Sequence, residues 1–248
     1  MNIHRIKTRL VNSYVIEYGD RLLVVDVALG CHLYVLGFIE QDLRRDIADV
    51  QLVLCTHDDP DHIGGVAALA AISNAEVAIP YASGATIRKW ANDSSGGLVR
   101  FATGLREAFR RRAWRMYVSP SRNRAARLQP KFTHFDSDTH SSAGLNPGYK
   151  LKNHQFIPGF DDWQVIHTPG HSWDSCCYYH RSSGSLISGD TLLGSNRKDA
   201  LVTPAIYSNQ RHTLQSIERL KSLDISTVYP GHGAVISGSR IIDQVKVG

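Results

Sequence analysis

Cysteine is scarce in this chain of 248 residues, and no two cysteines form a Cys-x-x-Cys pair. The four are Cys31, Cys55, Cys176 and Cys177. Without such a pair, the sequence offers no redox or metal motif built on that spacing. Adjacent Cys176 and Cys177 would point to opposite faces of a strand. We therefore expect buried, reduced thiols and, by default, a cytoplasmic protein.

Long apolar runs are also missing. The longest are far shorter than a membrane span, and residues 1–7 contain no apolar core of a signal peptide. We therefore expect no membrane partner. The composition is that of an ordinary globular protein, with 42% hydrophobic and 21% charged residues. A chain of this length can bury one large core, which predicts a single domain over residues 1–248.

The most informative segment is the loop at residues 56–65, which reads Thr-His-Asp-Asp-Pro-Asp-His-Ile-Gly-Gly. It follows a mostly apolar run at residues 50–55, so we expect this loop to begin at the end of a strand. Two His and three Asp share six positions, and charges that close repel unless a cation or solvent neutralises them. A solvated acidic loop with incidental histidines is the alternative to a metal site.

Three later segments repeat this arrangement of an apolar run, a turn and a potential ligand. They are residues 165–171, 186–192 and 228–233, and they supply His171, Asp190 and His232. Strands that end in turns present such side chains at one rim of a sheet. The residues themselves therefore predict a site for two cations, bound by histidine nitrogens and carboxylate oxygens.

The four ligand segments, in this order, resemble the metallo-β-lactamase superfamily, which includes glyoxalase II, acyl-homoserine lactonases and RNase Z-type nucleases. A fifth matching segment runs from Asn12 to Asp26. The resemblance covers most of the chain but leaves out roughly residues 92–155. It implies an α/β fold, the metallo-β-lactamase fold, in which two mixed sheets face each other between outer helices as a four-layer αββα sandwich.

The resemblance also implies a role for each ligand. His57 and His171 would bind the first metal, Asp190 would bridge the two ions, and a bridging hydroxide would be the nucleophile. Two cations lower the pKa of bound water and polarise the scissile group. Asp61 would also orient that hydroxide or accept its proton as a catalytic group. The ligands of the second metal would be Asp61, His62 and His232.

Asp59 departs from the family pattern, whose usual loop is His-x-His-x-Asp-His. A shorter, harder oxygen donor favours iron or manganese somewhat, although zinc accepts carboxylates too. We expect two divalent ions, with zinc first and iron or manganese as alternatives. Our hypothesis is that Asp59 binds the first metal directly or through water. The alternative is a weak or empty first site, with Asp59 only hydrogen-bonding nearby.

Three histidines fall outside the ligand positions: His167, His180 and His212. We interpret them as structural or exposed, with His167 the nearest to a supporting role because it shares a loop with His171. Zinc β-lactamases lack the bridging aspartate that Asp190 would supply, which argues against antibiotic hydrolysis as the main activity.

The segment at 92–155 is expected to be a basic helical insertion. Its apolar residues, from Leu98 to Met116, recur at helical intervals. Between positions 98 and 131 the sequence contains ten basic residues and one acidic residue, Glu107, so the local net charge is +9. The ten are Arg100, Arg106, Arg110, Arg111, Arg112, Arg115, Arg122, Arg124, Arg127 and Lys131.

Three interpretations of this insertion remain open. It forms a solvated face, a lid that selects an anionic or acyl substrate, or a nucleic-acid surface, for which no recognisable motif is present. His134, His140 and Tyr149 are candidates for substrate contact. Trp114 and Tyr117 are candidates for contact with a second subunit, which would make a homodimer.

Three functions follow. The leading one is hydrolysis of a small ester, lactone or thioester by the two-metal site, with a small-molecule substrate that the basic insertion suggests is anionic. A phosphodiesterase or nuclease with the same site is the alternative. A non-hydrolytic metal-binding or redox protein ranks last, because the ligand set is nearly intact.

The periodicity also predicts individual elements. Strands are expected at 10–18, 21–27, 50–55, 76–79, 163–167, 176–180, 185–188 and 226–229, and helices at 36–48, from about 64, and at 208–220. Val66, Leu69 and Ile72 would form the buried face of the second helix. Leu214, Ile217 and Leu220 would form that of the third, with Ser208 as its cap.

Overall fold

The computed structural model describes residues 1–8, 11–81, 95–111, 114, 147–195, 197 and 199–245. The chain divides into two compact units. The first contains Met1–Ile79 and Val118–Lys150, and the second contains Pro80–Tyr117 and Leu151–Gly248. Among the described residues, each helix is too short or too polar to cross a membrane.

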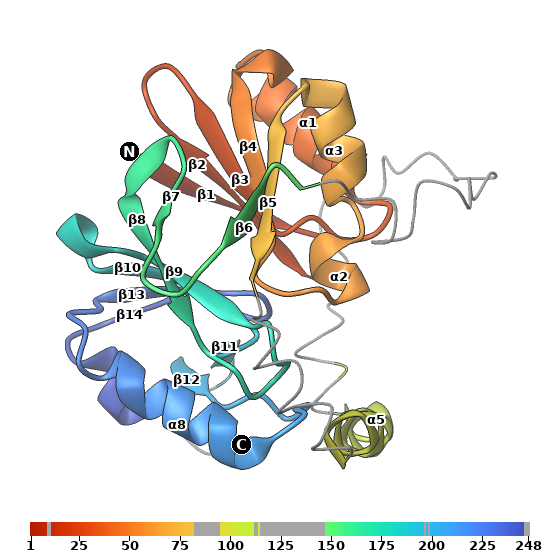
Figure 1. Cartoon of the computed structure of the whole chain (residues 1–248), viewed down its shortest axis with the longest axis vertical. Coiled ribbons are helices and arrows are strands. Elements are labelled where there is room, and N and C mark those ends of the chain that lie inside the picture. Colours follow the sequence, from red (N-terminus) through yellow and green to blue (C-terminus); the bar gives the residue numbers. More distant parts are fainter. Residues whose placement is uncertain are drawn as a thin grey trace. The chain divides into compact units, whose positions relative to one another are not determined.

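The first unit is built on a six-stranded sheet that starts as an antiparallel meander and continues with parallel strands (Figure 1). All four residues of β3 are buried, as expected for a strand covered on both faces. In order across the sheet, the strands are β1 (Asn2–Lys7), β2 (Asn12–Glu17), β3 (Leu22–Val25), β4 (Val50–Leu54), β5 (Glu76–Pro80) and β6 (Tyr149–Leu151).

Short helices cover this sheet and complete its core. Val35 of α1 (His32–Gly37) and Leu69 of α3 (Val66–Ser73) belong to the same apolar cluster as Val24 and Val53 of the sheet. Between β4 and α3 lies α2 (Pro60–Ile63). A π-helical turn (Phe38–Asp42) follows α1, and a 3-10 turn (Ile47–Asp49) precedes β4.

The helix expected at 36–48 is therefore wrong in its limits. Helical structure begins at His32, and it does not continue through Arg44, whose φ of 54° lies in the left-handed region. Arg45 then pairs with Asp49 and with Glu17 of β2, at N···O distances of 2.6 and 3.6 Å. These contacts hold the turn that leads into β4.

The second unit carries another six-stranded sheet, in which only β10 and β13 are parallel. Its order is β14 (Ile236–Ser237), β13 (Thr227–Pro230), β10 (Ser185–Gly189), β9 (Cys176–His180), β8 (Phe160–His167) and β7 (Phe156–Ile157). A separate hairpin joins β11 (Leu193–Ser195) to β12 (Ala200–Val202). The 3-10 turns are η5 (Arg181–Ser183) and η6 (Ile241–Gln244).

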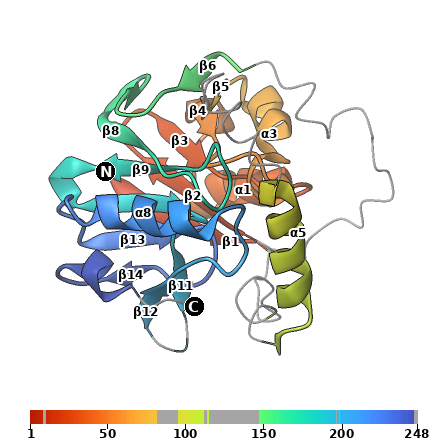
Figure 2. The same cartoon turned by 60° about the horizontal axis from the view of Figure 1, so that its bottom comes forward.

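Helix α8 (Gln210–Leu220) packs on this second sheet (Figure 2). Ile217 and Leu220 are buried as expected, but Leu214 is 40% exposed. Small polar residues take the remaining buried positions, and Ser216 Oγ donates to the carbonyl of Pro169. The cap is Asn209 rather than Ser208, because the Asn209 side chain accepts from the amide of His212. Ile72 of α3 is likewise exposed, and Ala70 is buried instead.

The expected insertion helix exists as α5 (Ser95–Ala108), which ends before Met116, and its apolar stripe is exposed. Leu98 and Phe101 are 72% and 71% exposed, whereas Thr103 and Glu107 are buried. Its polar side binds backbone carbonyls of the second unit, which an apolar stripe could not satisfy. Six of its basic residues, Tyr117, His134 and His140 lie outside the described residues, whereas Trp114 and Tyr149 are described and are 56% and 39% exposed.

Candidate metal centre

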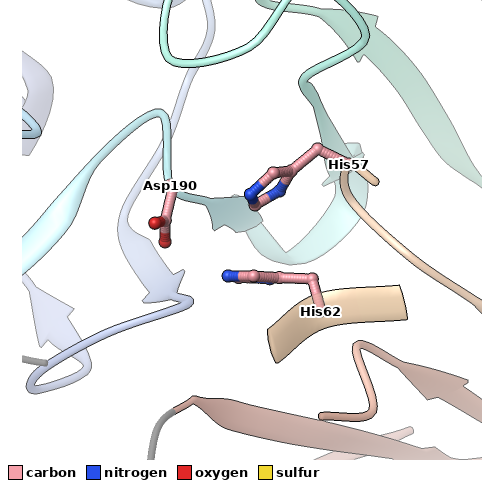
Figure 3. Close-up of side chains that lie close together, drawn as sticks. All are labelled: His57, His62 and Asp190. Atoms are coloured by element: carbon pink, nitrogen blue, oxygen red, sulfur yellow. The ribbon is translucent and has the colours of Figure 1, made fainter. Parts of the chain in front are cut away.

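The loop after β4 presents four of the predicted ligands in the first unit. His57 lies on the loop and His62 on α2, and both are fully buried (Figure 3). Pro60 is the first residue of α2, a position at which the amide hydrogen that proline lacks would have no acceptor within the helix. The backbone of the loop is tied to residues 27–29, since Val27 N donates to His62 O and Leu29 N to Pro60 O, at 2.8 and 3.0 Å.

Asp26 is the residue that orients His62. Its Oδ2 lies 2.8 Å from His62 Nδ1, and its Oδ1 accepts from the amide of Thr56 at 2.7 Å. The Thr56 hydroxyl contacts the same carboxylate and, at 3.0 Å, His57 Nδ1. One buried carboxylate therefore fixes both the loop and a ligand ring. Asp26 is not among the ligands predicted from the sequence, although its place directly after the buried strand Leu22–Val25 is a usable signal.

The loop carboxylates lie near the Nε2 edge of these rings, opposite the edge that carries Nδ1. Asp59 Oδ2 is 3.2 Å from His57 Nε2, and Asp61 Oδ2 is 3.9 Å from His62 Nε2. The two imidazole rings are stacked obliquely, with centroids 4.1 Å apart. Asp58 is exposed. The first unit thus gathers His57, Asp59, Asp61 and His62 around the Nε2 atoms of its histidines.

The second unit brings the remaining three predicted ligands together. Asp190, directly after β10 (Figure 3), has its Oδ2 3.3 Å from His232 Nε2 and 3.7 Å from His171 Nε2. All three side chains are at least 96% buried. A single carboxylate oxygen between two imidazole nitrogens is the arrangement expected of a shared ligand.

Backbone contacts place the two histidines of this unit. His171 Nδ1 lies 2.8 Å from the carbonyl of Ile206, which can only accept, so this nitrogen carries the proton. His232 precedes Gly233, whose φ is 88° and whose added Cβ would collide with the carbonyl oxygen of Gly194. The amide of Gly194 donates to the carbonyl of His232 at 3.0 Å. A side chain at position 233 would therefore displace the His232 segment.

The donor set fits divalent cations. Each of the seven predicted ligands belongs to a group of at least three His or Asp donors that could hold a metal ion. Three of the histidines, His57, His62 and His171, use Nδ1 for an oxygen partner, so Nε2 is the ligand atom. Imidazoles that bind metals are typically oriented this way by a second hydrogen bond.

The other three histidines have structural surroundings. His180 lies between Asp162 and Ser183, at 3.0 and 2.7 Å, and the backbone amide of His212 joins the cap of α8. His167 contacts the carbonyl of Trp173 at 2.8 Å, and burial lowers the pKa of its imidazole. His167 therefore organises the turn before β9 rather than contacting His171 directly.

The family description "Metallo-beta-lactamase superfamily" matches residues 6–232, which is most of the chain. The chain belongs to the metallo-beta-lactamase superfamily. Its fold is accordingly the metallo-beta-lactamase fold, with mixed sheets and helices. The matched range includes all seven of the ligand residues predicted above.

Curated relatives within this superfamily are distant and longer. The chain is 30% identical over 225 residues to "Atrochrysone carboxyl ACP thioesterase AgnL7" of Paecilomyces divaricatus, covering 91% of this chain and 51% of that protein. It is 21% identical over 225 residues to "Beta-lactamase-like protein 2 homolog" of Drosophila melanogaster, covering 91% of this chain and 59% of that protein. The chain thus spans just over half the length of these relatives.

Among solved structures, a metallo-beta-lactamase family protein from Thermus thermophilus superposes with a TM-score of 0.61. The sequences are 20% identical, and the match covers 98% of this chain and 76% of the Thermus chain. At this identity the likeness supports the metallo-beta-lactamase fold.

Proposed function

We propose that this protein is a dinuclear metal-dependent hydrolase that cleaves a small ester, lactone or thioester. The observation that carries the proposal is the position of Asp190 Oδ2 near Nε2 of both His171 and His232 in a buried setting. The proposed first-metal ligands are His57, Asp59 and His171, and the second-metal ligands are Asp61, His62 and His232. Asp190 is proposed to serve both ions.

Two such ions supply an activated water molecule and a Lewis acid for the scissile group. Asp61, which is less buried than His62, is proposed to orient the water and to hold its proton during the reaction. Asp26 and Thr56 keep His57 and His62 in their orientations. Five of the proposed ligands have side chains that are at least 96% buried, which strengthens the electrostatic contacts that they make.

The acyl substrate class is favoured by the thioesterase name of the Paecilomyces relative. We propose zinc as the first choice of metal, with iron or manganese as alternatives because Asp59 is a hard donor. A phosphodiesterase is the second candidate. The observation that favours it is the four described arginines at and just beyond α5, namely Arg100, Arg106, Arg110 and Arg111.

The test is elemental analysis of the purified protein, combined with turnover of a lactone, a thioester and a phosphodiester. We expect about two metal ions per chain and turnover of a carboxylic substrate that Asp190→Asn abolishes. Faster turnover of the phosphodiester, falling steeply with salt, would instead support the second candidate. One ion or none, without turnover after zinc, iron or manganese is added, would refute the dinuclear proposal.

A further inference from the structure

Two buried threonine hydroxyls join the turns that carry His171 and Asp190 in the second unit. Thr168 precedes His171 by three residues, and Thr191 directly follows Asp190. Oγ1 of Thr168 lies 2.7 Å from Oγ1 of Thr191, although the two residues are 23 positions apart in the sequence. The two threonines are 2% and 1% exposed. A short hydrogen bond that is shielded from water therefore links the two turns directly.

Each turn is also closed by a hydrogen bond of its own backbone. The amide of Thr168 donates to the carbonyl of Ser175 at 2.8 Å, which closes the first turn. The amide of Thr191 donates to the carbonyl of Ser188 at 3.1 Å, which closes the second. These backbone bonds shape each turn separately, whereas the hydroxyl pair connects one turn to the other.

The thiol of Cys177 completes the surroundings of this pair. Its Sγ lies 3.5 Å from Thr168 Oγ1, and it donates to the carbonyl of Ser188 at 3.6 Å. Burial raises the pKa of this thiol to about 11, so the thiol stays protonated and neutral. The Thr168 hydroxyl donates to the carbonyl of Ser175 at 3.4 Å, which leaves the Thr191 hydroxyl to donate to Thr168. Because both threonines are buried, water cannot readily replace either partner if one hydroxyl is removed.

The short distance between the two hydroxyl oxygens sets the separation of the turns. Two carbon atoms pack at about 3.5–4.0 Å, so methyl groups in place of these hydroxyls would move the turns apart by about 1 Å. Asp190 Oδ2 lies 3.7 Å from Nε2 of His171. Distances between a metal and its ligands vary by only about 0.2 Å. The hydroxyl pair therefore holds two proposed ligands at a separation that an apolar contact could not reproduce.

We propose that the Thr168–Thr191 hydroxyl pair positions His171 and Asp190 to bind the same metal ion. This inference rests on the proposed function of the same site, in which both residues bind the first metal. Neither threonine is a proposed ligand, so both are positioning residues that act through the turns. The first metal uses both linked turns, whereas the second uses only the turn of Asp190. Loss of the hydroxyl pair should therefore weaken binding of the first metal more.

The experiment is a titration of the metal-free protein with cobalt(II), whose visible absorption reports the coordination of each bound ion. The wild-type protein should bind about two ions. Thr168→Val combined with Thr191→Val replaces both partners by apolar groups of the same shape, so the double variant should fold. One of its two cobalt ions should bind about 10- to 100-fold more weakly than in the wild type. The absorption of that ion should also change.

Thr191→Ser is the conservative variant, because it keeps the hydroxyl, and it should bind cobalt(II) like the wild type. Thr227→Val is the matched control. It removes a hydroxyl that lies 3.0 Å from Oγ of Ser237, at the far end of β13 from His232. It should keep both wild-type affinities and the wild-type absorption. Thr191→Val alone tests the same hydrogen bond if the double variant does not fold.

Two results would overturn the proposal. One is wild-type cobalt affinity and absorption in the double variant, which would show that the turns keep their separation without the hydroxyls. The other is equal weakening in Thr191→Ser and the double variant, because the hydroxyl would then not be the group that matters.

Metal binding also separates this inference from the proposed function. If the wild-type protein binds two cobalt ions but turns over no ester, lactone or thioester, the hydrolase proposal fails, while the affinities still decide the role of the threonines. If the wild-type protein binds a single ion, the dinuclear proposal fails. Unchanged affinity for that ion in the double variant would then overturn the positioning role as well.

Discussion

Asp26 and His62 are 36 residues apart in the sequence, yet Asp26 Oδ2 lies 2.8 Å from His62 Nδ1, and both side chains are fully buried. Asp26 has a left-handed backbone, with φ of 59°, at the end of β3. The pair joins the end of β3 to helix α2 of the first unit, and it leaves Nε2 of His62 to bind a metal. It is therefore a structural support for a proposed metal site.

Asp26→Asn should weaken metal binding at His62 by about 10- to 100-fold. The amide would place a donor against Thr56 or His62, which both donate to the present carboxylate. Competition with a chelator, monitored by the metal retained, measures the effect. Asp20→Asn, at an exposed turn, is the control and should bind metal like the wild type. Equal retention in both variants would show that Asp26 does not tune the ligand.

Asp59→Ala should lower the metal content from about two ions to one, if Asp59 is a ligand of the first metal. Asp59 is the N-terminal cap of α2 but makes no side-chain capping bond, so its removal leaves the helix intact. Elemental analysis measures the content. The neighbouring Asp58→Ala is the control, because Asp58 is exposed. Two ions in Asp59→Ala would rule out a ligand role.

Gly233→Ala should destabilise the second unit by about 2–4 kcal/mol, since it combines a left-handed backbone with overpacking against Gly194. For a chain of this length, the expected fall in Tm is about 4–16 °C. Gly37→Ala is the matched control: its Cβ would meet nothing within 4 Å, and it lies in α1, where alanine is favoured. Equal Tm values for the two variants would show that the backbones at Gly194 and Gly233 can move apart without loss of stability.

Cys177 should resist alkylation in the folded protein. Burial raises the pKa of its thiol to about 11, so only about 0.1% is thiolate at pH 8. The other three cysteines are also buried thiols that form no disulfide. Mass spectrometry after iodoacetamide treatment should find negligible labelling of the native protein and four labels after unfolding in guanidinium. Rapid native labelling of Cys177 would contradict the buried environment.

The strands were predictable because their apolar runs are short and end at turn residues. Runs at 50–55 and 176–180 became β4 and β9 within one residue at each end. The limits of helices were less predictable. Arg44 and Asn209 decide where helical structure ends or starts, and both act through backbone conformation and local hydrogen bonds that periodicity does not encode.

The orientation of α5 could not be predicted from its spacing. The spacing of Leu98, Phe101 and Leu105 correctly predicts a helix, but the side that faces the protein is polar. Available carbonyls at Ala205 and Tyr207, distant in sequence, select Arg106 and Thr103 for that side. The same long-range contacts bring Arg100 to His171, and no local pattern contains this information.

The sequence by itself determined the family, the type of fold and the identity of the candidate ligands. The reason is that each short segment contains both an apolar run, which predicts a strand, and the His or Asp that follows it. Only the tertiary structure decided which groups orient those ligands. Asp26, Ile206 and Gly194 act on residues distant along the chain, and hydrogen bonds and steric contacts of this kind exist only after the strands have paired.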